Sequence, residues 1–116
     1  MMLGTILTIL VAAIHFYFLY LEMFKWEAPR TRKAFGMTEE LASQTVVMAA
    51  NQGLYNGFLG AGLLIGLVTG NASMVVFLLC CVIVAGLYAL YCGLRAALFA
   101  QSLPAIAALI AVWMAL

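Results

Sequence analysis

The placement of charged residues constrains the fold of this chain more than any other feature. No charged residue precedes Glu22, none lies between Leu41 and Leu94, and none follows Arg95. Uncharged apolar runs of about 18 or more residues are typical of transmembrane helices. The run from Leu41 to Leu94 is long enough for two such helices, and the segment TGNAS at 69–73 provides a turn between them. The chain is therefore expected to cross a membrane several times.

The composition also argues against a soluble domain. Of the 116 residues, 68% are hydrophobic and 8% are charged, and a soluble domain of this length cannot bury so much apolar surface. We therefore predict an all-α fold, a single transmembrane domain over residues 1–116 that forms a four-transmembrane-helix bundle. The first helix lacks the basic leader and the short apolar core of a signal peptide, so we expect it to be retained. The predicted helices cover residues 2–26, 39–68, 73–96 and 98–116, with a loop at 27–38.

The basic residues predict the orientation of the chain in the membrane. Lys25, Arg30, Arg32 and Lys33 lie between the first and second predicted helices, and Arg95 lies between the third and fourth. With four spans, these two connections are on the same side, which the positive-inside rule makes cytoplasmic. Both termini would then lie outside, an N-out/C-out arrangement, with the loop inside.

The predicted cytoplasmic loop contains signals for helix ends. Pro29 is expected to end the first helix, because the residue before a proline avoids helical geometry. Thr38, followed by Glu39 and Glu40, is expected to cap the second helix, with the two acids at the positive end of its dipole. The basic cluster predicts contact with membrane lipids. It is too short and lacks a supporting fold for nucleic-acid binding, so we expect no nucleic-acid partner.

The cysteines predict no metal or cofactor chemistry. Cys80, Cys81 and Cys92 all fall in the third predicted helix, without a CxxC pair or a histidine nearby in the sequence. This spacing does not match that of a metal site. We therefore expect no metal and no cofactor.

Polar residues inside the predicted spans fall into two layers. With a helix rise of about 1.5 Å per residue, His15 is about 15 Å from Lys25, near the middle of a hydrocarbon core of about 30 Å. The second helix starts at the same boundary, which predicts that its amides reach the same depth. The deeper layer consists of His15, Asn51, Gln52, Tyr55, Asn56 and Tyr88, and the shallower layer of Glu22, Gln44, Tyr91 and Arg95.

Helical spacing places these polar residues on shared faces. His15 and Glu22 are seven residues apart, as are Tyr88 and Arg95, and such pairs lie on one face of a helix. Unpaired polar groups that face lipid cost several kcal/mol, so we expect the faces to meet in a polar interior that reaches the cytoplasmic leaflet. The candidate ligand-binding residues are His15, Glu22, Asn51, Gln52, Tyr55, Asn56, Tyr88, Tyr91 and Arg95.

Two alternative arrangements of this interior are open. If it is a working site, the polar residues should line one cavity with His15 at its deepest point. If it is structural, the amides should pair directly with one another as hydrogen bonds between helices. In both cases we expect Glu22 and Arg95 to approach each other, directly or through water, because an isolated charge at that depth is costly.

Small residues and a proline predict how the helices pack. Gly53 and Gly57 form one GxxxG pair and Gly62 and Gly66 another, and such pairs let helix backbones approach closely. A homo-oligomer through this glycine-rich second helix, or through the fourth, is a further expectation. Pro104 should have helical backbone on both sides, or lie in a tilted junction buried against the third helix, because a helix that starts at 103 would be only about 21 Å long.

Three strings carry a resemblance to a known family. HFYFLYLEMFKW, RKAFG and NQGLYNGFLGAGL, in this order and spacing, resemble domain-of-unknown-function family 1304, whose members are small bacterial four-helix integral membrane proteins. The resemblance extends over nearly the whole chain. It implies a four-helix fold in the bacterial inner (plasma) membrane and no established reaction. Some members carry the label epimerase, but no nucleotide-sugar motif accompanies these strings.

Three functional classes fit a polar interior of this kind. The first is a small transporter or exporter, in which Glu22 or His15 binds a proton or cation while the helices rock. The second is an intramembrane isomerase or epimerase with His15 and Glu22 as acid and base, and Tyr88 or Asn51 orienting a substrate oxygen. The third is a structural or accessory subunit. We favour a site in the cytoplasmic half that binds a lipid-like or small-molecule ligand, with transport ahead of catalysis.

Overall fold

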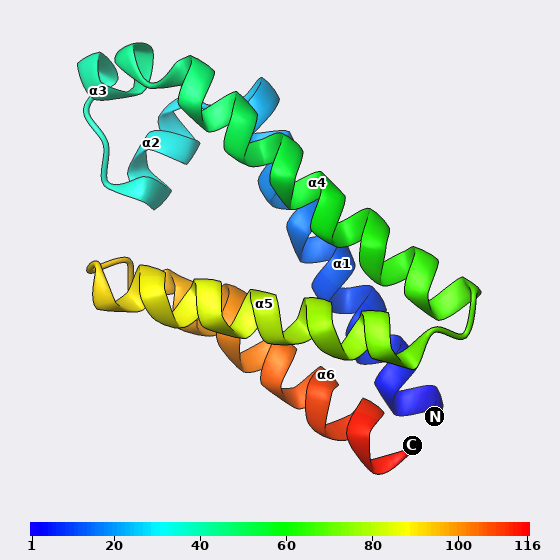
Figure 1. The fold of residues 1–116 in the computed structure, drawn as a ribbon. Coiled ribbons are helices and arrows are strands. Elements are labelled where there is room, and N and C mark those ends of the chain that lie inside the picture. Colours follow the sequence, from blue (N-terminus) through cyan, green and yellow to red (C-terminus); the bar gives the residue numbers. More distant parts are fainter.

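The computed structural model describes residues 1–116 and is entirely helical, which confirms the predicted all-α fold. Four long helical segments dominate: α1, α4, α5, and the continuous segment formed by η1 and α6 (Figure 1). Two short helices lie between α1 and α4. The elements are α1 Met2–Phe24, α2 Pro29–Phe35, α3 Glu39–Gln44, α4 Val46–Val68, α5 Ala72–Tyr91, the π-helix η1 Leu98–Ser102 and α6 Leu103–Met114.

The long helices form two pairs that meet at one end of the molecule and separate toward the other (Figure 1). α1 packs along α4, and α5 packs along η1 and α6, while contacts of α1 with α6 and of α4 with α5 join the pairs. Both termini and the α4–α5 turn lie at one end, which we call the closed end. α2, α3 and the α5–η1 turn lie at the other, which we call the charged end because every charged residue of the sequence is on these segments or at the adjoining end of α1.

The hydrophobic core occupies the middle of the bundle and extends toward the closed end. It contains small and branched side chains from α1, α4, α5 and α6, so all four long segments contribute to it. Because the helix pairs separate beyond this core, the charged end is not filled by core side chains. The fully buried members are Val11, Ala12, Leu63, Val75, Leu79, Val82, Ala105 and Ala108.

Glycines on α4 make close contacts with the neighbouring helices. A Cβ atom on Gly53 would lie 2.8 Å from Met23 Cγ and 3.0 Å from Glu22 Cβ of α1, so the backbones of α1 and α4 are close together here. Gly62 and Gly66 meet α5 in the same way. The predicted close approach through small residues is present, but it lies within one chain. A homo-oligomer through α4 or α6 stays a prediction.

The segment predicted as a loop at 27–38 contains a helix. α1 ends at Phe24, and α2 begins with Pro29 in its first turn, a position that suits proline because its missing N–H is not needed there. α2 ends at Gly36, which has a left-handed φ of 65° that glycine adopts without strain. Pro29 therefore starts a helix and does not end the first one as predicted.

The second predicted helix, 39–68, is divided at Thr45. Its start is as expected, because Leu41 N donates to Thr38 Oγ1 at 3.1 Å. Thr45 has a φ of −113°, outside the helical range, and its hydroxyl donates to Leu41 O at 2.8 Å while it accepts from Trp26 Nε1 at 2.9 Å. This contact with the end of α1 turns α3 away from α4.

The third and fourth predicted helices also differ in their bounds. α5 ends at Tyr91 and not at 96, and Gly93, with a φ of 102°, turns the chain toward η1. The helical backbone then continues through Pro104 on both sides, as predicted. The π-helix lies immediately before Pro104, where the proline ring would clash with the carbonyl four residues earlier in a regular α-helix.

Two helices, α1 and α5, are long and apolar enough to cross a membrane, and Leu98–Met114 is a shorter apolar helix. Only 28% of the residues in the most apolar stretch of α1, and 22% of those in α5, are buried, so neither is an enclosed core helix. α4 has 23 residues, but Asn51, Gln52 and Asn56 reduce its apolar character. By length and hydropathy, two of the four predicted spans are candidates, and the four-span bundle stays a proposal.

Candidate functional site

A cavity of about 550 Å³ lies between the two helix pairs at the charged end. Of its 17 lining residues, 13 are hydrophobic, and Glu22 is the only one with a charged side chain. Small-molecule sites in proteins are typically apolar clefts of about 300–1,000 Å³ with a few polar groups. The cavity therefore has the size and the lining of a ligand site. Its walls are Tyr17, Phe18, Leu21, Glu22, Ala34, Phe35, Gln52, Asn56, Leu59, Ala85, Tyr88, Ala89, Leu94, Ala96, Ala97, Ala100 and Gln101.

A hydrogen bond between α1 and α4 forms the polar part of the wall. Asn56 Nδ2 donates to one carboxylate oxygen of Glu22, and both side chains are buried, 8% and 9% exposed. Gly53 allows this contact, because it brings the α1 and α4 backbones together one turn away. The second carboxylate oxygen of Glu22 has no hydrogen-bond partner within the chain. It is available to a molecule in the cavity.

Four further polar side chains line the cavity without a hydrogen bond inside the chain. Gln52 comes from α4, Tyr17 from α1, Tyr88 from α5 and Gln101 from η1. Amides and phenols both donate and accept hydrogen bonds. The cavity thus offers adaptable hydrogen-bonding groups on opposite walls, around an otherwise apolar interior.

The π-helix positions Gln101 in the cavity wall. A Cβ atom on Gly86 would lie 3.0 Å from both Ser102 N and Gln101 Cβ, so α5 and η1 are in backbone contact. Ser102 Oγ donates to Ile83 O at 3.3 Å and joins the same two elements. This close packing fixes the position of η1 opposite α1.

The short helix α2 lies across the cavity at the charged end. Ala34 and Phe35 line the cavity, and the Phe35 ring packs on Trp26 with ring centroids 5.0 Å apart. Trp26 is held in turn by its hydrogen bond to Thr45.

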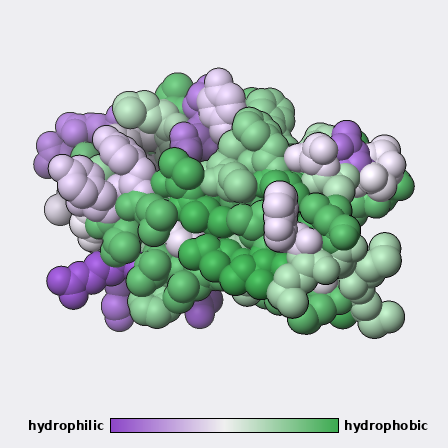
Figure 2. Space-filling view, turned by 60° about the horizontal axis from the view of Figure 1, so that its bottom comes forward, coloured by the Kyte–Doolittle hydropathy of each residue, from purple (hydrophilic) through white to green (hydrophobic).

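Figure 2 shows hydrophilic residues gathered mainly at one end of the molecule and hydrophobic residues over most of the remaining surface.

His15 is buried beside the cavity and does not line it. The side chain is 1% exposed, and its Nδ1 is 2.8 Å from Val11 O. Phe18, which does line the cavity, packs edge-on against the imidazole with ring centroids 5.5 Å apart. The arrangement with His15 at the deepest point of the cavity is therefore wrong, because Phe18 covers it.

The amides of α4 lie nearer the charged end than predicted. The hydrogen bond of Asn56 to Glu22 puts these two at the same level, and Glu22 is seven residues, or about 10 Å, from His15 along α1. The prediction took the second helix as starting at 39. Because the chain turns at Thr45, α4 starts later in the sequence than the predicted helix. Asn56 therefore lies about two helical turns nearer the charged end than predicted.

Five of the nine predicted binding residues do not line the cavity. His15 is buried beside it, whereas Asn51, Tyr55, Tyr91 and Arg95 are exposed and turn away. Glu22, Gln52, Asn56 and Tyr88 are brought together as expected.

Glu22 and Arg95, which were predicted to approach each other directly or through water, make no direct contact. Arg95 is exposed in the α5–η1 turn, and the hydrogen-bond partner of Glu22 is Asn56. The early end of α5 explains this difference, because Arg95 is no longer on the helical face that carries Tyr88.

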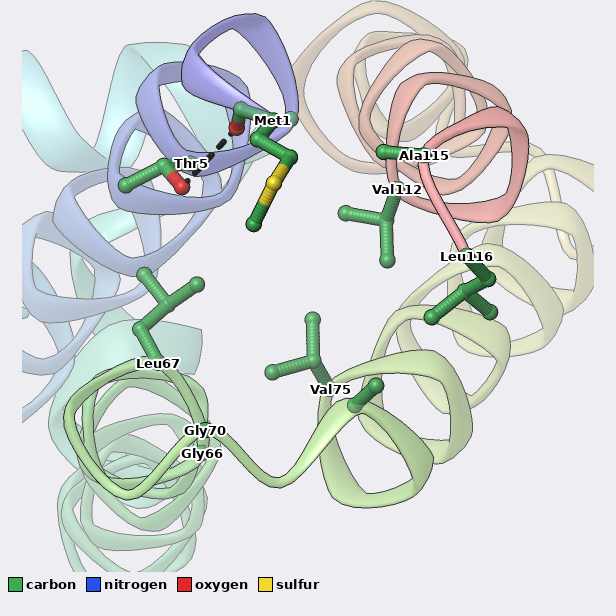
Figure 3. Close-up of a pocket in the computed structure, with 11 residues that line it drawn as sticks. Met1, Thr5, Gly66, Leu67, Gly70, Val75, Val112, Ala115 and Leu116 are labelled. Atoms are coloured by element: carbon green, nitrogen blue, oxygen red, sulfur yellow. Dashed lines mark hydrogen bonds between the residues drawn. The ribbon is translucent and has the colours of Figure 1, made fainter.

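A second, smaller cavity of about 200 Å³ lies at the closed end. Figure 3 shows side chains around it from the two chain ends and from α4, α5 and α6, namely those of Met1, Leu67, Val75, Val112 and Leu116. Its lining is mostly apolar and contains no charged side chain. The hydrophobic core separates this cavity from the one at the charged end.

Sequence reasoning missed the aromatic part of the larger cavity and one of its amides. Tyr17 and Phe18 precede Leu21 and Glu22 by four residues each, a spacing that puts each pair on one side of a helix, so a signal for them was present. Gln101 lies in a segment that looks like an ordinary apolar helix, and no pattern in the sequence indicates the π-helix.

Comparison with known proteins identifies relatives of unassigned function. The family described as "Protein of unknown function (DUF1304)" matches residues 9–113. The "Uncharacterized protein YpaA" of Lactococcus lactis subsp. lactis (strain IL1403) is 36% identical over 109 residues, which cover 90% of this chain and 92% of that protein. No solved structure matches the chain.

Proposed function

For this chain, which belongs to the DUF1304 family of proteins of unknown function, we propose the function of a membrane protein that binds a lipid-like or small-molecule ligand. The ligand occupies the cavity at the charged end, with its apolar part among the alanines and aromatic rings. Its polar part contacts Glu22, Asn56 and the neighbouring amides. The observation that carries this proposal is the cavity of about 550 Å³, lined by apolar residues and by an incompletely paired carboxylate.

A multi-pass position in the bacterial inner membrane is part of the proposal. Large hydrophobic side chains are exposed along all four long segments, among them Ile9, Phe58, Phe77 and Ile110, and such surface is unusual on a soluble monomer. α4 is about 35 Å long and Leu98–Met114 about 26 Å, close to a hydrocarbon core of about 30 Å. All charged residues gather at one end, which the positive-inside rule makes cytoplasmic, with both termini outside.

Among the activities that a bound ligand allows, transport has one specific observation in its favour. The second cavity at the closed end has no charged side chain in its lining and lies beyond the hydrophobic core. Movement of a ligand from one cavity to the other would require the two helix pairs to part at the core residues Val11, Leu63 and Leu79.

An isomerase or epimerase has less support in the geometry. Exchange of a proton on two faces of a carbon needs two acid–base groups on opposite sides of the substrate. Glu22 is in the cavity, but His15 is separated from it by Phe18. A purely structural subunit would be expected to fill the space between the helix pairs, and the cavity argues against that role.

Binding can be tested with the neutral fluorescent dye N-phenyl-1-naphthylamine. The Trp113→Phe variant leaves Trp26 as the single tryptophan, so fluorescence energy transfer to the dye comes from Trp26, next to Phe35 at the cavity. We expect saturable transfer in neutral detergent micelles. Ala85→Phe should weaken the affinity by roughly fivefold or more, since an aromatic side chain fills much of the cavity.

The matched control is Val84→Phe, one residue along α5. Val84 is 65% exposed and does not line the cavity, so this variant should bind the dye as the parent protein does. Transfer that never saturates, or that is equal in the Ala85→Phe and Val84→Phe variants, would overturn the proposal.

A further inference from the structure

We propose that the cavity selects organic cations, that is, ligands with a positive centre on a hydrophobic body. This inference rests on the proposed function and narrows its ligand class. Glu22 is the only charged side chain among the lining residues, and no lysine or arginine accompanies it. The only charge in the cavity wall is therefore negative.

The surroundings of Glu22 leave a place for a positive group. Its carboxylate is 9% exposed and has one hydrogen bond, from the neutral amide of Asn56. A carboxylate in such surroundings is stabilised when a counter-charge approaches it, because one amide does not replace the hydration that burial removes. Because Glu22 lines the cavity, a ligand bound there can supply this counter-charge.

Aromatic rings provide a second feature that favours a cation. Tyr17 and Phe18 from α1, Phe35 from α2 and Tyr88 from α5 all line the cavity. The faces of aromatic rings carry partial negative charge and attract cations within about 6 Å. Rings from three elements together with one carboxylate form the type of environment that binds ammonium groups attached to apolar bodies.

An anionic ligand would meet the opposite situation. Lys25, Arg30 and Lys33 are exposed at the charged end and none of them lines the cavity. A phosphate or carboxylate inside the cavity would face Glu22 without a compensating cation, which is unfavourable when both groups are removed from water. The basic residues are placed to contact lipid headgroups outside the cavity.

The test uses two ions that share shape and size and differ in charge, tetraphenylphosphonium and tetraphenylborate. Each competes against the neutral dye described above, in micelles of a neutral detergent. We expect the phosphonium to displace the dye at a concentration at least tenfold lower, because a single opposite charge in a partly buried site contributes at least this much.

Variants of Glu22, Glu27 and Gln52 separate the effect of a charge in the cavity wall from the effect of a charge elsewhere on the protein. Glu22→Gln should weaken phosphonium binding by roughly tenfold more than it weakens binding of the neutral dye, since glutamine removes the charge but can still accept the Asn56 hydrogen bond. Glu27→Gln, which removes one exposed acid outside the cavity, should change neither. Gln52→Glu adds a carboxylate to the wall and should strengthen phosphonium binding, a gain that misfolding cannot produce.

Equal competition by the two ions would overturn the inference. It would also be overturned if Glu22→Gln weakened dye binding and phosphonium binding equally and Gln52→Glu did not strengthen phosphonium binding. In these cases saturable dye binding that is sensitive to Ala85→Phe would still support the proposed function. Absence of saturable dye binding would instead overturn both.

Discussion

Replacing Gly53 by alanine should push α1 away from α4 at the wall of the cavity. The added Cβ would lie 2.8 Å from Met23 Cγ, 3.0 Å from Glu22 Cβ and 3.3 Å from Leu19 O. Non-bonded carbon atoms pack at about 3.5–4.0 Å, so a displacement of roughly 0.5–1 Å is needed. Glu22 Cβ and Leu19 O are attached rigidly to the α1 backbone. The whole helix must therefore move.

The expected loss of stability combines three effects. Overpacking of a close contact costs about 1–3 kcal/mol, and alanine in a helix recovers about 1 kcal/mol relative to glycine. The displacement also weakens the hydrogen bond of Asn56 to Glu22, and a bond to a charged group contributes about 1.5–3 kcal/mol. We expect Gly53→Ala to lower the free energy of unfolding by about 1–3 kcal/mol, and to weaken dye binding.

Gly57→Ala is the matched control on the same helix face. Its Cβ would contact only the Leu19 side chain, with Cδ1 at 2.6 Å, and the end of this side chain can turn aside. The helix propensity of alanine should then leave the protein as stable as the parent or up to about 1 kcal/mol more stable. Unfolding in mixed micelles of neutral detergent and dodecyl sulfate, followed by Trp26 fluorescence, measures both variants. Equal stability of Gly53→Ala and Gly57→Ala would refute the rigid contact of α1 with α4.

Three further predictions concern stability and orientation. Thr8→Val should raise the free energy of unfolding by about 1–2 kcal/mol in the same micelles, because Thr8 Oγ1 is buried without a hydrogen-bond partner; a destabilised variant would contradict this. Trp26→Phe and Thr45→Val should each cost about 1 kcal/mol, and the double variant should cost less than the sum of the two, so additive losses in a double-mutant cycle would argue against their hydrogen bond. A C-terminal alkaline phosphatase fusion should be active in a bacterial host, whereas an inactive fusion with a fluorescent cytoplasmic reporter at the same position would reverse the proposed orientation.

Local patterns predicted the fold where the cause is local. Long uncharged runs indicated the long helices, Thr38 with the two following acids indicated a cap, and the GxxxG spacing indicated that α4 approaches a neighbouring helix closely. The division of the helix at Thr45 was not predictable in this way. It depends on a hydrogen bond from Trp26, which is 19 residues away in the turn between α1 and α2.

The candidate site shows the same limit. Glu22, Gln52, Asn56 and Tyr88 were predicted and line the cavity, because polar residues at helical spacing turn toward one another. His15 has the same face as Glu22 but lies behind Phe18, and spacing along one helix cannot reveal which side chain covers another. The position of Asn56 along α1 depends on the turn at Thr45. It was predicted incorrectly because the division of the second helix at Thr45 was not predicted.

Photoaffinity labelling tests the binding of an amphiphile in the cavity most directly. A long-chain alcohol that carries a diazirine on its alkyl chain would be activated with the protein in lipid nanodiscs, and the labelled peptides identified by mass spectrometry. We expect labelling on residues 17–22, 52–59 and 85–89 that excess unlabelled alcohol and the Ala85→Phe variant both suppress. Labelling that is confined to outward residues such as Phe77 and Ile110, and that excess unlabelled alcohol does not reduce, would contradict a ligand site between the helix pairs.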